Sequence, residues 1–72
     1  MIELTFQVAY PFLQKIENIG AEGLFEVQNI QYSDMILGTI LFPETEKQHI
    51  KTLLSDLTSG SIKFLSEVSK NT

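Results

Sequence analysis

Residues 2–10 read Ile-Glu-Leu-Thr-Phe-Gln-Val-Ala-Tyr, in which a large apolar side chain occupies every second position. This period of two predicts a β-strand over about residues 2–9 with one buried face. Residues 50–57 read Ile-Lys-Thr-Leu-Leu-Ser-Asp-Leu and place apolar residues at i, i+3, i+4 and i+7 instead. That spacing is typical of an amphipathic helix.

A short helix is predicted between the first strand and Gly20. Pro11 suits its first turn, where the missing N–H of proline has no helical partner to lose. The apolar positions that follow have helical spacing and form the predicted buried stripe: Phe12, Leu13, Ile16 and Ile19.

Two further strands follow this helix. Between residues 24 and 32 the alternation changes phase at Gln28-Asn29, which indicates a β-bulge. Ser33-Asp34 supplies a tight turn. Residues 35–42 are apolar at almost every position, which is typical of a central strand.

The second helix is predicted to start near Thr45 and to end near Thr58. Thr45 and Gln48 have the spacing of a capping box, and Gly60 fits the left-handed residue after a helix end. The last strand is inferred from the alternation of Ile62, Phe64 and Val68, and a polar tail, residues 69–72, follows it.

The order strand-helix-strand-strand-helix-strand predicts an α+β, ferredoxin-like βαββαβ sandwich as a single domain over residues 1–72. Its four-stranded antiparallel sheet has the order 4-1-3-2, and both helices cover one face. Strands one and three are central. The polar residues of strands two and four agree with edge positions.

The composition of the chain argues against several classes of function. The chain of 72 residues has nine acidic residues, five lysines and no arginine, for a net charge of -4, and it contains no cysteine. Nucleic-acid binding rests on cationic contacts to phosphate and is therefore disfavoured. The absence of thiolates removes redox motifs and cysteine nucleophiles. Without an apolar run long enough to cross a bilayer, the chain reads as soluble and cytoplasmic, with no membrane association.

Few residues suggest catalytic chemistry. His49 is the single histidine and forms one Glu-x-x-His with Glu46, a spacing that di-iron proteins use in pairs. We expect a solvated helix flank there, without a metal. Residues 58–61 resemble a phosphate loop but follow a helix C-terminus, where carbonyls point outward, so a helix cap is expected. We predict no catalytic residues, no cofactor and no enzymatic activity.

Three other positions are candidate ligand contacts. Tyr10 and Tyr32 end strands, and we expect their rings to be buried with the hydroxyls in water. Gly38 lies in the apolar third strand and is expected to permit close packing. The candidate binding surface is instead the sheet face that the helices leave open, with these residues: Glu3, Thr5, Gln7, Lys63, Leu65 and Glu67.

A family resemblance covers nearly the whole chain. Tyr10-x-x-Leu13, Ile30-x-Tyr32-x-Asp34 before an apolar strand that ends at Pro43, and Leu54-x-Asp56-Leu57-Thr58-x-Gly60 resemble the C-terminal domain of bacterial YigZ and IMPACT-type proteins. In that family the domain is ferredoxin-like and is similar to the last domain of elongation factor G. The resemblance implies an excised C-terminal domain of a larger protein, and a translation-associated or regulatory binding role.

Two functions follow as expectations. The first is a non-catalytic accessory domain that contacts a protein partner, or the family's N-terminal domain, through the open sheet face or an edge strand; edge strands also offer a route to a homodimer. The alternative is a small-molecule-sensing regulatory or dimerisation domain of the ACT type, which has the same strand order. Ligand sites at its first strand-to-helix junction favour Gly, whereas this chain has Tyr10-Pro11.

Overall fold

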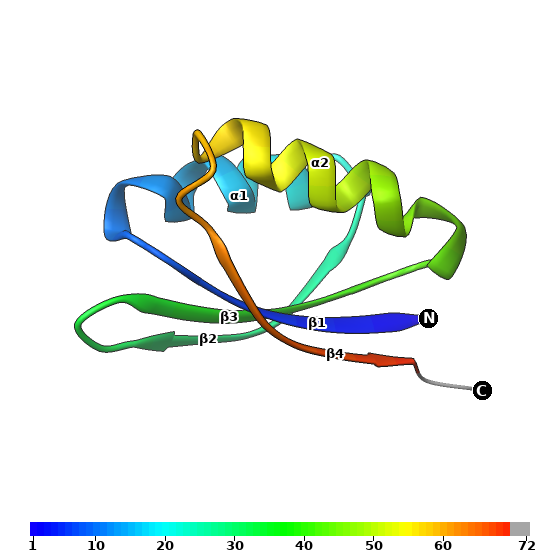
Figure 1. Cartoon of the computed structure of the whole chain (residues 1–72), viewed down its shortest axis with the longest axis horizontal. Helices are drawn as coiled ribbons and strands as arrows, with labels where there is room; N and C mark the ends of the chain where they lie inside the picture. Colours follow the sequence, from blue (N-terminus) through cyan, green and yellow to red (C-terminus); the bar gives the residue numbers. More distant parts are fainter. Residues whose placement is uncertain (70–72) are drawn as a thin grey trace.

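The computed structural model describes residues 1–69 and has the expected order of strands and helices (Figure 1). The polar tail predicted for residues 69–72 lies outside the described residues from residue 70 onward. The strands and helices are β1 Ile2–Val8, α1 Leu13–Ala21, β2 Glu26–Tyr32, β3 Ile36–Phe42, α2 Lys47–Leu57 and β4 Lys63–Ser69. Two 3-10 turns precede the helices, η1 Tyr10–Phe12 before α1 and η2 Glu44–Glu46 before α2.

The four strands form one sheet with the order β2-β3-β1-β4, and the pairings are antiparallel. This is the predicted order 4-1-3-2 read in the opposite direction, with β1 and β3 in the centre. Both helices lie on one side of the sheet, and the other side is open (Figure 1). The ferredoxin-like fold class is therefore confirmed.

The core lies between the helices and the covered face of the two central strands. β1 and β3 bury every second residue, which is the burial pattern that their alternation predicts. Leu54, central in the predicted stripe of α2, is fully buried. The buried apolar residues are Ile2, Leu4, Phe6, Val8, Ile16, Phe25, Ile36, Ile40, Phe42, Ile50, Leu54 and Ile62.

Gly38 is a packing residue, as expected. It lies opposite Phe6 in the β1–β3 register, and the Phe6 ring covers it. A Cβ at position 38 would lie 2.6 Å from Cζ of Phe6. The close neighbour is therefore a side chain from the adjacent strand, and the glycine makes room for one of the three phenylalanines of the core.

The start of α2 differs from the prediction. Thr45 belongs to η2, and neither η2 nor α2 has a side-chain cap hydrogen bond. The predicted capping box is wrong because the chain leaves Pro43 through a 3-10 turn, which closes with a bond from the Glu46 N–H to the Pro43 carbonyl (2.9 Å).

The end of α2 is a Schellman turn shifted by one residue from the prediction. Ser59, with φ of 54°, is the first left-handed residue, and Gly60, with φ of 80°, follows it. The Gly60 N–H donates to the Ser55 carbonyl (2.7 Å) and the Ser59 N–H to the Asp56 carbonyl (3.2 Å). Thr58 adds a buried side-chain link, donating to the Leu54 carbonyl (2.9 Å) and accepting from the Ile62 N–H (3.2 Å).

Both edge strands contain a register shift. The shift in β2 falls between Val27 and Asn29, so Gln28 is the extra residue and the predicted bulge is confirmed. A second shift interrupts the β1–β4 ladder, where Phe6 lies opposite Phe64 but Thr5 lies opposite Ser66. Leu65 is the extra residue there, which the sequence pattern did not predict.

Candidate interaction surface

The open face of the sheet is organised in rows of residues that lie side by side on neighbouring strands, because directly paired residues point to the same side. At one end the row is acidic and apolar: Glu26, Leu41, Glu3 and Val68. The middle row has short polar side chains: Asn29, Thr39, Thr5 and Ser66. The row nearest the β2–β3 hairpin is Gln31, Leu37, Gln7 and Lys63.

Four of the six predicted surface residues lie on this face. Glu3, Thr5 and Gln7 alternate with the buried residues of β1, and Lys63 lies opposite Gln7. Thr5 also contacts the next central strand, since its hydroxyl lies 3.2 Å from that of Thr39. The centre of the open face is therefore fixed by a side-chain bond between β1 and β3.

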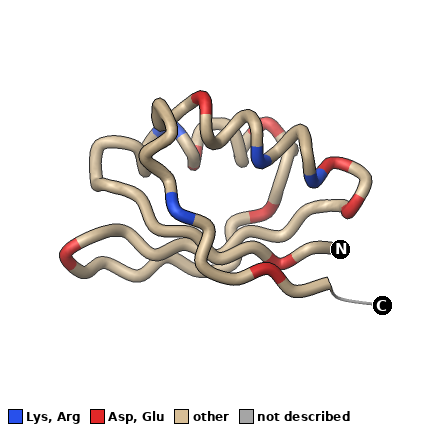
Figure 2. Tube along the Cα trace, in the orientation of Figure 1, with Lys and Arg blue, Asp and Glu red and all other residues tan. Residues whose placement is uncertain are grey.

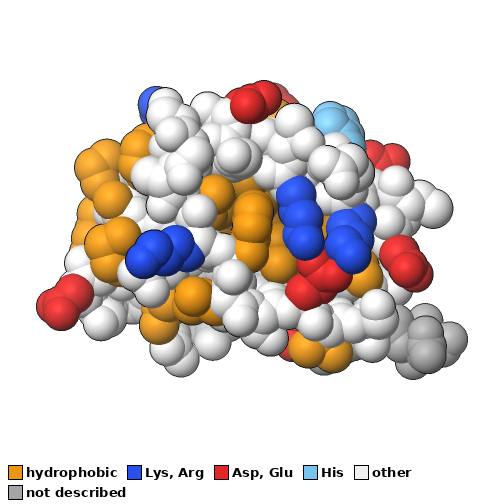
Figure 3. All heavy atoms as spheres, viewed as in Figure 1, with side chains coloured by type: hydrophobic (Ala, Val, Ile, Leu, Met, Phe, Trp, Pro, Cys, Tyr) orange, Lys and Arg blue, Asp and Glu red, His pale blue; other side chains and the backbone are white. Residues whose placement is uncertain are grey.

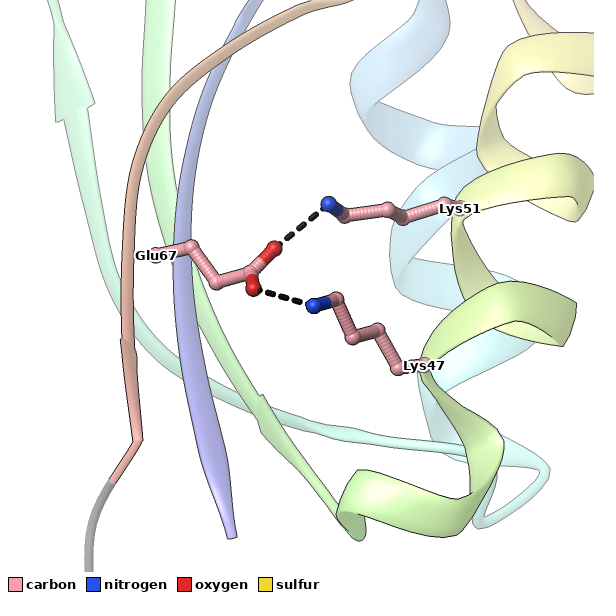
Figure 4. Close-up of polar contacts among 3 residues, drawn as sticks. All are labelled: Lys47, Lys51 and Glu67. Carbon is pink, nitrogen blue, oxygen red and sulfur yellow. Dashed lines mark ion pairs between the residues drawn. The ribbon is translucent and has the colours of Figure 1, made fainter.

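Glu67 does not lie on the open face, and its predicted position there is wrong. It is opposite Leu4, a core residue, and its side chain points toward α2 (Figure 4). The bulge at Leu65 is the physical reason, because one extra residue reverses the side to which all later residues of a strand point. Leu65 itself lies at the bulge and is 51% exposed.

The carboxylate of Glu67 is held between two lysines of α2. Lys47 Nζ lies 2.7 Å from one carboxylate oxygen, and Lys51 Nζ lies 2.5 Å from the other (Figure 4). The hydrogen bond from Lys47, followed by that from Lys51, lowers the pKa of Glu67 from its ordinary value. The same bond raises the pKa of Lys47.

Apolar side chains of β4 remain exposed around this ion pair. Phe64 is 39% exposed and lies under Lys51, whose Nζ is 5.6 Å from the centre of the ring. Figure 3 shows the lysines above an acidic side chain between α2 and β4, with hydrophobic side chains beside them. This side of the molecule is therefore occupied by the protein's own contacts, whereas the open face has no covering layer.

Sequence patterns alone missed several residues of the open face. On β4 these are Ser66 and Val68, which the expected uninterrupted alternation would have placed with the helices. The adjacent apolar pair Phe64-Leu65 was a usable signal, because two large apolar neighbours break the period of two. The other residues missed are Glu26, Asn29, Gln31, Leu37, Thr39 and Leu41.

The two bulges make the sheet edges less suitable for the addition of another strand. A bulge twists an edge strand and interrupts its row of backbone groups, which is one way in which proteins protect a sheet edge. Here β2 has one at Gln28 and β4 has one at Leu65. The edges are therefore poorer templates for another strand than the sequence suggested, and the open face is the better candidate surface.

Tyr10 and Tyr32 are more exposed than predicted. Their exposed fractions are 47% and 66%, and their ring centres lie 6.3 Å apart. The Tyr10 hydroxyl donates to the carbonyl of Ser33 in the β2–β3 hairpin. The expectation of buried rings is wrong, because neither helix reaches over this end of the sheet; the pair instead anchors the hairpin to η1.

His49 and Glu46 form an exposed pair where η2 meets α2. His49 is 60% exposed, and its Nδ1 lies 3.1 Å from a carboxylate oxygen of Glu46. Within residues 1–69 no three His, Asp or Glu side chains converge in a way that could hold a metal ion. Residues 58–61 form the helix C-terminal turn described above, as expected. The absence of a metal at His49 stays a prediction.

Charge is distributed unevenly between the layers. Figure 2 shows positive segments on the helix layer and at the start of β4, while negative segments occur on both layers. On the open face, Glu3 and Glu26 share one row and Lys63 lies at the opposite end. No helix within residues 1–69 is long and apolar enough to cross a membrane.

No protein-family model matches the chain, and no curated protein is significantly similar to it in sequence.

Proposed function

We propose that this chain is a non-catalytic accessory domain, similar to the C-terminal domain of YigZ and IMPACT-type proteins, that binds a protein partner in a translation-associated process. The family and the process rest on the sequence resemblance described above. The binding role rests on the open sheet face.

Partly exposed apolar residues on the open face are the observation that supports a binding role. Leu37 and Leu41 on central strand β3 lie on the uncovered face and are only half-buried, and Val68 on β4 is 46% exposed. A sheet usually buries one face against a helix layer and keeps the other polar if water covers it. Apolar residues on a central strand of the open face therefore favour a second layer that a partner supplies.

The charges favour a protein partner over RNA. Within residues 1–69, the charged residues paired across the open face are Glu3, Glu26 and Lys63, and the chain contains no arginine. Single-stranded RNA needs a cationic groove and exposed aromatic rings for base stacking. Here the phosphates would meet negative potential, whereas a protein surface can supply complementary charge.

The ligand-sensing alternative gains no specific support from the geometry. At the β1-to-α1 junction the chain turns through η1, which contains Tyr10 and Pro11. A surface hollow at the hairpin end of the sheet lies beside that junction and is lined by Gln7, Ser33, Asp34, Met35 and Leu37, none of them a glycine.

Site-specific photo-crosslinking tests the proposal. We would place a benzophenone amino acid at Leu41, on the open face, and as a matched control at Asp56, which is exposed on α2. In cells that contain the protein naturally, we expect defined protein adducts from position 41 only, and mass spectrometry should identify translation components among them. Equal adducts from both positions would contradict the proposed surface.

RNA binding is the second readout. The isolated domain should not bind RNA with micromolar affinity at about 150 mM salt. A steep loss of a measurable affinity as salt rises would return the domain to the nucleic-acid class.

A further inference from the structure

We propose that the partner covers the open face with a basic amphipathic helix that lies along β3. This inference rests on the proposed function and specifies the chemistry of the partner. The leucines of β3, the charges on either side of them and the bulged sheet edges support it.

The column of open-face residues on β3 has a leucine at each end, a threonine in the middle and the length of a helix stripe. Leu37, Thr39 and Leu41 are alternate residues of β3 on the open face, and all three are half-buried. At about 3.3 Å per residue the column spans roughly 13 Å. A helix presents apolar residues at i, i+3, i+4 and i+7 over about 10.5 Å, so one such stripe covers the column.

The flanks of the column differ between its two ends. Leu41 lies between Glu26 on β2 and Glu3 on β1, whereas Leu37 lies between Gln31 and Gln7. Glu26 and Glu3 are two strand spacings apart, roughly 9.6 Å, which is close to the width of a helix of about 10 Å. A helix on β3 would therefore have a carboxylate on each side at this end and neutral amides at the other.

This arrangement specifies both the charge and the direction of the helix. Lysines or arginines on the β2 side of its apolar stripe would pair with Glu26, and those on the β1 side would add to the contact that Glu3 already makes within the protein. The positive end of the helix dipole is also favoured near carboxylates, so the N-terminus should lie at the Leu41 end of β3.

Two other occupants fit less well. A second copy of the chain, stacked face to face, would bring together two molecules that each carry a net charge of -4. An added strand would have to pair with β2 or β4, and both contain a bulge. A helix avoids both obstacles because it needs no backbone pairing and can carry the opposite charge.

A designed peptide serves as the probe. It is an amphipathic helix of about 18 residues, or five turns, with a leucine stripe and two lysines on each side of that stripe in its N-terminal half. The matched control has glutamate at the same four positions. Amide NMR of the whole chain should show saturable shifts with the lysine peptide, centred on Leu37, Thr39 and Leu41, and at least about tenfold weaker binding of the glutamate peptide.

Two charge reversals test the flanking carboxylates. Glu26→Lys should weaken binding of the lysine peptide by about fivefold to tenfold. Glu22→Lys makes the same change of charge at an exposed position at the end of α1 and should leave the affinity within about twofold. Equal losses in both variants would show that net charge alone attracts the peptide, and would overturn the proposal.

Two other results would also overturn the proposal of a helix on β3. Shifts centred on β4 or on the helix layer would place the site elsewhere, and concentration-dependent shifts without peptide would identify a second copy as the occupant. These failures are distinguishable from failure of the proposed function. If crosslinks from position 41 persist while the peptide does not bind, the open face binds a partner of another kind and only the helix is wrong.

Discussion

The carboxylate of Glu67 on edge strand β4 lies 2.5 Å from Nζ of Lys51 on α2, on the side of the sheet that the helices cover. Lys47, one turn earlier on α2, contacts the other oxygen at 2.7 Å. These bonds connect β4 to the helix layer through side chains. They matter for β4 because all of its residues are exposed and none belongs to the buried core. The connection is electrostatic and therefore depends on pH.

Glu67→Gln should lower the stability of the fold at neutral pH and make no difference in strong acid. The folded state lowers the pKa of Glu67 below its ordinary value of 4.5 through the bonds from Lys47 and Lys51. A lowered folded-state pKa contributes stability that is fully present above the unfolded value and is lost as pH falls through the folded value. The difference in urea midpoint between parent and variant should therefore shrink below about pH 4.5.

The matched control is Glu22→Gln, an exposed glutamate at the end of α1. Its urea midpoint should stay close to that of the parent from about pH 7 to about pH 3, because single exposed charges contribute little. A Glu67→Gln difference that stayed constant down to the lowest pH at which the parent is folded would show that the side chain acts through packing and not through its charge.

Ser59→Gly should stabilise the domain, and Gly60→Ala should destabilise it. Ser59 has a φ of 54°, a conformation that costs a side chain about 1 kcal/mol relative to glycine. Gly60 has a φ of 80°, and a methyl group added there would have no neighbour within 4 Å, so the cost of alanine is conformational and not steric. Chemical denaturation of both variants should give shifts of opposite sign; a destabilised Ser59→Gly would contradict the assigned turn.

The fold could be predicted from the sequence because its decisive patterns are local. The alternation in β1 and the helical spacing of Ile50 to Leu57 each specify a buried face, and the order of the elements leaves few topologies. The bulge at Gln28 was visible as a change of phase. The 3-10 turn after Pro43 was not, since Thr45 and Gln48 have the spacing of a capping box whether or not the box forms.

The candidate site was predicted only in part, because it depends on which side of the sheet each residue of β4 faces. Residues before the bulge were placed correctly, as Lys63 shows, and Glu67 after it was not. A single extra residue reverses every later side chain, so a small error in register removes Glu67 from the surface and adds Ser66 and Val68. Sequence patterns missed the acidic row for a different reason. Glu26 and Glu3 lie on different strands and share a row only because both strands pair with β3 in the folded sheet.

Leu54→Ala should nearly abolish folding. Leu54 is fully buried between α2 and the sheet. Truncating a packed leucine costs about 2 to 5 kcal/mol, and a domain of this size without disulfides has a net stability of about 3 to 5 kcal/mol. Leu57→Ala, at a half-buried position on the same helix, is the control and should leave a cooperative transition. Circular dichroism during urea titration measures both, and a Leu54→Ala midpoint near that of the parent would contradict this packing of α2.

Deleting Leu65 should keep the fold but increase self-association through β4. Without the extra residue, Phe64 and Ser66 become neighbours opposite Phe6 and Thr5, so the ladder with β1 is regular and Glu67 still lies opposite Leu4. A regular edge with exposed Phe64 and Val68 is a better template for pairing with another chain. Leu65→Ala keeps the bulge and serves as the control. Sedimentation velocity at increasing concentration should show larger species for the deletion alone; identical sedimentation of both variants would mean that the bulge does not protect this edge.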